Sequence, residues 1–360
     1  MSGDSSEQAS EFLSKNKFRY LIMAAVLIAS VLLAVYSFGK GSQVISMDKV
    51  WEIIGNHIHN TVPSRSDDYW GWLYNRLIFE GTIPVGIGAL LVGAILGMAG
   101  AVMQNCVRNP LADPYTTGIS SAALFGVTIN LALGISLLPV TEDTGNIVNA
   151  LVFAMIPCAL MLLLSIRGKT TTTQLVLIGI GVMYLFSAIT MMLKYNAEPE
   201  ILNQIYAWSV GSVSKIGWTG VYCLLPTTIL LFISLYILSP RIDVVAMGDN
   251  MSHSLGVDPV RTRLLCMVII SCATAVAVSF SGSIGFVGLV IPHVSRLLVG
   301  SKSKMLIPCS AVLGAFLLIG AEILSRMLTQ GLPAGAITAL IGAPVFLYFL
   351  FKIRTNGWGK

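Results

Sequence analysis

Long apolar stretches separated by short polar ones fill almost the whole chain. Stretches of about 20 apolar residues, each long enough to cross a hydrocarbon core of about 30 Å, recur ten times. They cover residues 20–38, 83–105, 115–138, 147–166, 174–193, 219–238, 264–280, 286–299, 305–325 and 334–351. Because the bilayer interior offers no water to backbone groups, each stretch must be helical. The pattern predicts an all-α integral membrane protein with about ten transmembrane helices.

Composition supports this prediction and basic residues give the topology. Of 360 residues 55% are hydrophobic and 11% charged, against about 25% charged in soluble domains. An N-terminus placed inside puts fifteen of the 22 Lys and Arg residues on the cytoplasmic side, as the positive-inside rule requires. We therefore expect two cytosolic tails, 1–19 and 353–360, around a single transmembrane domain, 20–352.

Three polar segments interrupt the apolar pattern. Residues 41–81 form an expected outer loop, and residues 241–263 an expected cytosolic loop. A third segment, 195–217, is too polar to span and predicts a short helix, since irregular backbone at membrane depth usually lines a pathway. Its candidate pathway or gate residues are Trp208, Ser209, Gly211 and Ser212.

The cytosolic loop combines small residues with apolar ones that we expect to be exposed. A membrane protein without catalytic residues in its spans needs a point where energy or a signal enters, and this composition favours docking on a partner. The candidate docking residues are Met247, Gly248, Asp249, Met251, Leu255, Gly256, Val257 and Arg261. An ordinary solvated loop is the alternative.

The second span is rich in small residues and ends in a proline-rich turn. Gly93 and Gly97 form a G-x-x-x-G pattern that lets helix backbones approach closely, which predicts a central position for this helix. The turn that follows is rigid, because proline fixes φ and restricts its predecessor. Its notable residues are Gln104, Arg108, Asn109, Pro110, Asp113 and Pro114. Asp113 is placed to cap the next helix.

These motifs together closely resemble a known family. The matching strings are 100–104 (GAVMQ), 108–114 (RNPLADP), 118–121 (GISS), 208–212 (WSVGS), Gly248 with 255–257, 282–296 and 332–346. They resemble the signature of FecCD-type permeases, the membrane subunits of type II ABC importers for iron chelates, haem and vitamin B12. The resemblance covers about residues 83–352 in order.

The resemblance implies a type II ABC importer permease bundle in the cell membrane of a bacterium or archaeon. It implies a homodimer with the pathway at its two-fold interface, two separate ATPase subunits that grip residues 243–260, and an extracytoplasmic substrate-binding protein. The implied cargo is an iron(III)–siderophore chelate, with vitamin B12 or haem as alternatives. The resemblance implies no catalytic, cofactor or metal site in this chain and no nucleic-acid partner.

The chain departs from the family pattern where the binding protein would dock. Thr82 and Val85 stand where the family usually has arginines. The family has a docking arginine at the position of Arg326, and Glu322 lies four residues earlier, where it can pair with Arg326. With Arg76 as the nearest substitute in sequence, the candidate docking residues are Arg76, Glu322 and Arg326. Lys302 to Lys304 and Gly331 also differ from the family pattern.

Two other classes of protein compete with this interpretation. A secondary transporter would need ion-binding carboxylates at mid-membrane, and the spans show none at their centres. An intramembrane enzyme would need a catalytic constellation, which the motifs do not supply. Residues 168–170 (GKT) resemble the end of a phosphate-binding loop, but Leu163 replaces its first glycine, so the chain is not expected to bind ATP.

Overall fold

The computed structural model describes residues 3–40, 45–167, 172–328 and 332–355. Within them, seven helices are long and apolar enough to cross a membrane. The helices that contain these spans are α1 (Gly3–Phe38), α4 (Ile83–Val107, extended outward by α3 and η1), α6 (Glu142–Arg167), α7 (Thr172–Tyr195), α9 (Trp218–Ala246), α11 (Pro259–Ser281) and α13 (Ser303–Leu328). Three shorter apolar helices are α5 (Ile119–Leu133), α12 (Val287–Val299) and α14 (Ala334–Thr355). All ten fall on the predicted stretches, so the predicted fold class is confirmed.

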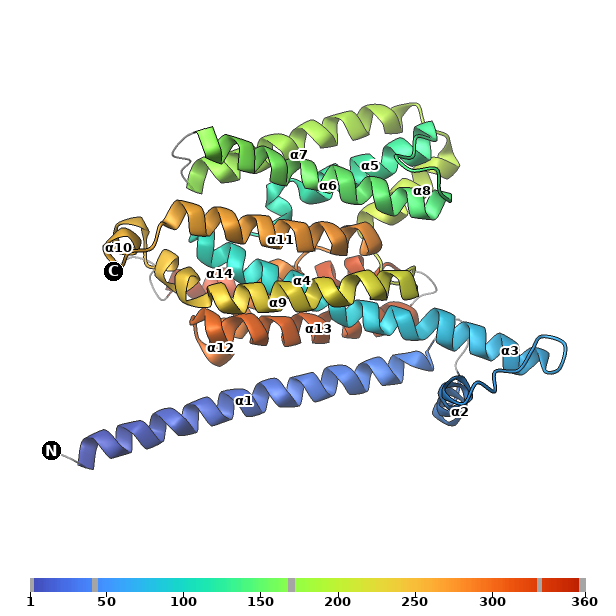
Figure 1. Cartoon of the computed structure of the whole chain (residues 1–360), viewed down its shortest axis with the longest axis horizontal. Helices are drawn as coiled ribbons and strands as arrows, with labels where there is room; N and C mark the ends of the chain where they lie inside the picture. Colours follow the sequence, from blue (N-terminus) through green and yellow to red (C-terminus); the bar gives the residue numbers. More distant parts are fainter. Residues whose placement is uncertain (1–2, 41–44, 168–171, 329–331, 356–360) are drawn as a thin grey trace.

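Helix α4 is the core of the bundle. It runs beside α9, α11, α12 and α13 (Figure 1), and nearly all of its residues are buried. A Cβ atom at Gly93 would lie 2.3 Å from the carbonyl oxygen of Gly314, and one at Gly97 would lie 2.2 Å from that of Ser310. Only glycine allows backbones to approach this closely. The central position predicted for this helix is therefore confirmed.

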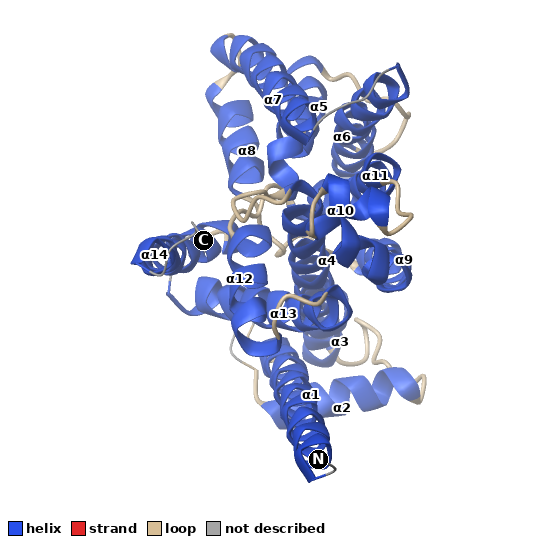
Figure 2. Ribbon diagram, turned by 90° about the vertical axis from the view of Figure 1, so that its left-hand side faces the viewer, coloured by secondary structure: helices blue, strands red, loops and turns tan. Residues whose placement is uncertain are grey.

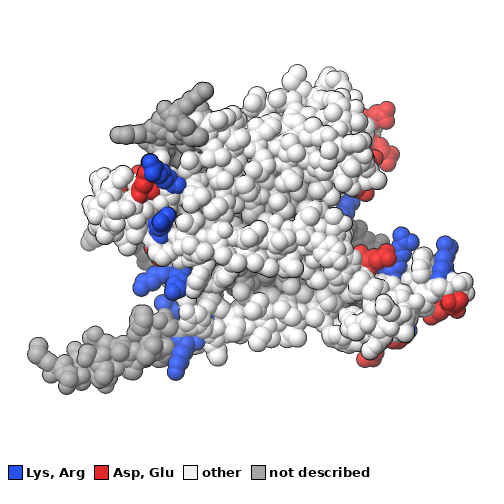
Figure 3. Space-filling view, in the orientation of Figure 1, with Lys and Arg blue, Asp and Glu red and all other residues white. Residues whose placement is uncertain are grey.

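Charged side chains gather at the two ends of the bundle. Lys and Arg dominate the end that carries α10 (Asp249–Ser254), and a mixture of acidic and basic residues lies at the opposite end, around α2 (Met47–Ile58) and α3 (Tyr69–Asn75) (Figure 3). On the face shown in Figure 3, the surface between the two ends is almost free of charge. Such a band fits a bilayer core, and the basic end is the expected cytoplasmic side.

The polar segments are more helical than the sequence suggests. Segment 41–81 holds α2, α3 and a π-helical segment, η1 (Arg76–Thr82), which continues directly into α4. The third polar segment, by contrast, contains the short helix that was predicted for it, α8 (Pro199–Val210). Helix α1 begins at Gly3, so most of the expected N-terminal tail is helical. Residues 168–170 and Gly331 lie outside the described residues.

The main correction concerns the expected cytosolic loop 241–263, because both of its ends lie within helices. Helix α9 continues to Ala246, because Ile242 and Val245 are buried and Asp243 Oδ1 accepts a hydrogen bond of 2.8 Å from the backbone N–H of Ser303. Helix α11 already begins at Pro259, so Arg263 lies buried within a helix. The segment between α9 and α11 is therefore limited to residues 247–258, with α10 at its centre.

Candidate functional site

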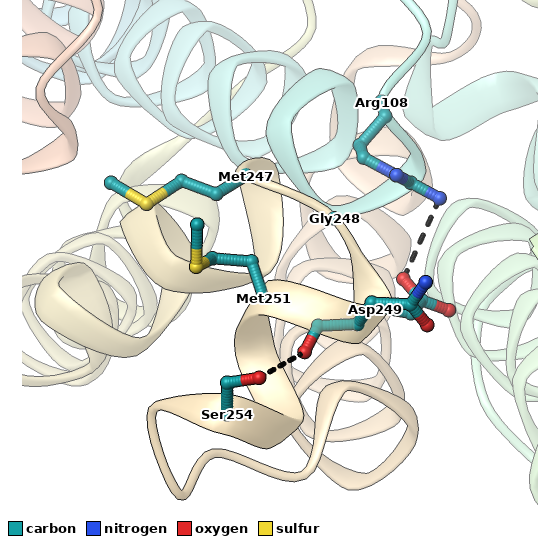
Figure 4. A pocket seen from close by; sticks show the side chains of 7 residues that line it. Arg108, Met247, Gly248, Asp249, Met251 and Ser254 are labelled. Carbon is teal, nitrogen blue, oxygen red and sulfur yellow. Dashed lines mark hydrogen bonds and ion pairs between the residues drawn. The ribbon is translucent and has the colours of Figure 1, made fainter.

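Helix α10 is a short, exposed helix at the basic end of the bundle. Positive φ angles at Gly248 (114°) and Gly256 (74°) turn the chain before and after it, conformations that glycine adopts at little cost. Met247, Met251 and Leu255 are exposed. Met251 and Leu255 lie four residues apart on α10 and its C-cap, and Met247, at the end of α9, lies beside Met251 (Figure 4). The result is a small apolar surface that faces away from the bundle.

Buried polar contacts fix α10 to the end of α9. Ser252 is fully buried, and its hydroxyl lies 2.7 Å from the carbonyl oxygen of Gly248 and 3.0 Å from that of Val244. Because a buried hydroxyl must be hydrogen-bonded, this side chain sets how α10 packs against α9. The exposed apolar surface is thereby held in one orientation.

An arginine that is only 1% exposed ties α10 to the central helix α4. Arg263 Nη2 lies 2.9 Å from Asp249 Oδ1, and Arg263 Nε donates to the carbonyl oxygen of Cys106 at 2.8 Å. Arg108 Nη2 approaches the same Asp249 oxygen at 3.5 Å (Figure 4). A buried guanidinium is stable only when it is paired and hydrogen-bonded. We call Arg263, Asp249 and the Cys106 carbonyl the clamp.

The proline-rich turn after α4 forms the other wall of this site. Arg108 ends α4 in the left-handed conformation, with φ 54°. Asn109 Oδ1 accepts from the backbone N–H of Leu111. Asp113 Oδ1 accepts from the backbone N–H of Tyr115 and so caps η2 (Pro114–Thr117), as the sequence predicted. Burial raises the pKa of Asp113 to about 6.

A second polar network joins three helices just inside the turn. Arg296 donates to Gln104 Oε1 at 2.5 Å and to Asn105 Oδ1 at 2.9 Å. Gln104 Nε2 donates to the carbonyl oxygen of Leu289, and Asn105 Nδ2 donates to Ser303 Oγ. These contacts of Arg296 were not predicted from the sequence. The feature that could have indicated them is the pair of amide side chains, Gln104 and Asn105, at the end of an otherwise apolar span.

The candidate pathway residues lie at the end of α8 and in the turn that follows it. Figure 2 shows loops meeting between α8 and α14. The backbone N–H of Ser212 donates to the carbonyl oxygen of Ser281, and Gly335 donates to that of Gly211. A Cβ atom at Gly211 would lie 2.4 Å from the Ser283 carbonyl oxygen, so the close approach requires glycine. Trp208, Ser209 and Ser212 are half-buried beside these contacts.

The three residues expected to dock the binding protein have different environments. Arg326 and Glu322 form the predicted ion pair at 2.8 Å, and Arg326 also donates to the carbonyl oxygen of Lys40 at 2.8 Å. The Arg326 side chain is only 16% exposed and the Glu322 side chain 1%. Arg76 is 62% exposed and lies 3.4 Å from Glu80. Arg326 therefore holds the end of α1, and Arg76 is the accessible cation.

The described residues thus form an all-helical membrane domain with a short exposed helix, α10, held by buried polar contacts at its basic end. The chain belongs to the FecCD transport family, whose pattern matches residues 26–352. It is thus an ABC permease subunit, not itself an enzyme, and a multi-pass protein of the cell membrane. Membership implies an ATPase and a substrate-binding protein as partners.

Three relatives match 76% to 92% of the chain. A Helicobacter pylori protein described as a "Probable iron chelatin transport system permease protein" is 36% identical over 91% of this chain and 98% of its own. The cobalamin import system permease protein BtuC of Halobacterium salinarum is 38% identical over 76% of this chain and 73% of its own. A solved structure described as an inward-facing metal-chelate type ABC transporter is 31% identical, with a TM-score of 0.78, over 92% of this chain and 99% of its own.

Proposed function

We propose that the chain imports an iron(III)–siderophore chelate as the permease half of an ABC importer. It acts as a homodimer with the pathway at the two-fold interface, and two ATPase subunits dock on its cytoplasmic end. Of the two import permeases compared by sequence above, the one described as an iron chelatin permease covers more of this chain, 91% against 76%, which favours this cargo. No covalent chemistry falls to this chain, since its work is alternation between outward and inward states.

The observation that carries the proposed coupling is the clamp. The ATPase would grip residues 243–260, where Met247, Met251 and Leu255 form an exposed apolar surface. Through Asp249 and Arg263 that surface is joined to α4 and α11. Because α4 packs against α1, α9, α11, α12 and α13, a displacement of α10 would reach the whole bundle rather than one loop.

The proposed pathway lies beside the turn around Gly211. Helices α8 and α14 project on the same side of the molecule (Figure 2), and α14 leaves apolar side chains such as Leu340 and Leu347 exposed there. A second copy on this side would enclose the half-buried Ser209 and Ser212. Cysteines at these two serines should react with an external thiol reagent at rates that depend on the nucleotide state. Equal rates in every state would instead indicate a static surface.

The test of cargo and mechanism is uptake by proteoliposomes that contain the permease, the ATPase encoded with it and the binding protein. We expect ATP-dependent accumulation of radiolabelled iron supplied as a ferric siderophore, and none with ADP. Unlabelled cobalamin and haemin serve as competitors. A chelate that is not taken up while either competitor is would overturn the proposed cargo but leave the importer mechanism standing.

Cobalamin is the second candidate cargo. It is favoured by the identity of 38% with the cobalamin import permease, although that match covers less of the chain. A secondary transporter is disfavoured, because among the described residues the buried carboxylate within a span is Glu322, and it is paired with Arg326.

A further inference from the structure

A hollow opens between α10 and the turn that follows α4. It measures about 660 Å³ and is lined by Arg108 on one side and by Met247, Asn250, Met251 and Ser254 on the other (Figure 4). We propose that this hollow receives a carboxylate side chain of the ATPase, with Arg108 as its cationic contact and the two methionines as its apolar flank. The proposal rests on the proposed function and adds the turn after α4 to the docking surface.

The charges around the hollow do not balance. Asp249 is the one carboxylate there, and the same oxygen, Oδ1, serves both arginines. Arg263 lies at 2.9 Å and is 1% exposed, so it depends on this contact. Arg108 lies at 3.5 Å from that oxygen and is 45% exposed. Two cations therefore share one anion, and the surplus positive charge lies on Arg108.

The chemistry of Arg108 selects the partner group. A guanidinium binds carboxylates through two parallel hydrogen bonds, and Arg108 is exposed enough to form them. Met247 and Met251 are flexible, polarisable side chains that adapt to an apolar partner surface. Arg108 has a left-handed backbone conformation. A Cβ atom at Gly248 would lie 3.1 Å from Arg108 Nη1, so the guanidinium lies directly over the start of α10.

We assign the hollow to the ATPase because residues 247–251 and Ser254 line it, and these residues belong to the segment on which the ATPase is proposed to dock. Any protein that covers Met247 and Met251 must also cover Arg108, since all three line the same space. An anionic lipid headgroup offers a similar charge to Arg108. For this reason the experiment uses nanodiscs made of phosphatidylcholine alone, and it repeats the key measurement with phosphatidylglycerol added.

The experiment measures the affinity of the ATPase encoded with this permease for the reconstituted permease, at low and at high salt. We expect Arg108→Asn to weaken binding about tenfold and Arg108→Glu about a hundredfold at low salt, with a flatter salt dependence in both. Arg108→Lys keeps the charge but loses the two parallel hydrogen bonds, so its affinity should lie between those of the wild type and Arg108→Asn. Lys302→Glu, which adds the same charge at the same end but outside the hollow, should change it less than about threefold.

Asparagine is the decisive neutral variant, because it tolerates the left-handed conformation that Arg108 adopts. If Arg108→Glu fails to fold, Arg108→Asn therefore still tests the contact. Unchanged affinity and salt dependence in the folded variants would overturn the proposal, as would an effect that requires phosphatidylglycerol. Failure of the wild-type permease to bind this ATPase at all would overturn the proposed function instead.

Discussion

At the scale of single residues, the clamp has a measurable energetic consequence. Arg263 is almost fully buried with Asp249 as its one acidic partner. A buried charge that loses its partner typically costs about 3 to 5 kcal/mol, and the partial exposure of Asp249 reduces that figure. We expect Asp249→Ala to lower the free energy of unfolding by about 2 to 3 kcal/mol, seen as a lower midpoint of thermal unfolding in detergent.

Glu80→Ala is the matched control for this prediction. It also removes the acidic partner of an arginine, but Arg76 and Glu80 are both largely exposed. Exposed pairs contribute only about 0 to 1 kcal/mol, so its midpoint should barely move. Equal shifts in the two variants would show that Arg263 does not depend on Asp249.

At the scale of helices, close backbone contact decides how α4 packs. A Cβ atom at Gly100 would lie 1.9 Å from the carbonyl oxygen of Gly288 in α12. We expect Gly100→Ala to separate the two helices and to destabilise the protein by at least about 1 to 3 kcal/mol, the usual cost of overpacking. Gly320→Ala in α13 meets no atom within 4 Å and should be neutral or slightly stabilising, because alanine favours helix. Thermal unfolding of both variants distinguishes a specific contact from a general effect of the methyl group.

The docking surface of α10 gives a second prediction at this scale. Gly256 has a φ of 74° and open space around its Cα, so a long side chain there meets nothing within the subunit. We expect Gly256→Arg to remain folded and to abolish association with the ATPase and uptake. Gly256→Asn, which tolerates the same φ and adds a short side chain, should retain most of both. Co-purification of an undiminished ATPase complex with Gly256→Arg would exclude this surface.

The ten predicted spans fell on ten apolar helices because hydrophobic length and bilayer thickness determine such helices locally. The ends of the polar segments could not be predicted in the same way. Asp243 and Ile242 are compatible with a cytosolic loop until the helices that bury them are known. Arg263 likewise looked like a cytoplasmic charge, because sequence gives no sign that the Cys106 carbonyl and Asp249 meet it. Partners distant in sequence make these contacts, so only the fold reveals them.

At the scale of the whole molecule, we expect the two charged ends to meet different partners. The ATPase is expected at the basic end with α10 and the binding protein at the far end, where Thr82 and Val85 stand in place of the arginines of the family pattern. Of the two candidate arginines, Arg326 is ion-paired with Glu322 and hydrogen-bonded to the Lys40 carbonyl oxygen at the end of α1. Arg76 on η1 is left as the accessible cation.

We therefore expect Arg76→Glu to slow association of the binding protein severalfold at low salt and much less at high salt, because exposed charges act mainly on the association rate and are screened. Glu80→Gln frees Arg76 from its partner and should raise the rate slightly. Arg326→Glu should lower thermal stability first, since it places a second acid beside the buried Glu322. The measurement is the association rate with reconstituted permease across a salt series. An unchanged rate and salt dependence in Arg76→Glu would move the docking surface to the exposed aromatic residues Tyr69 and Trp70 of α3.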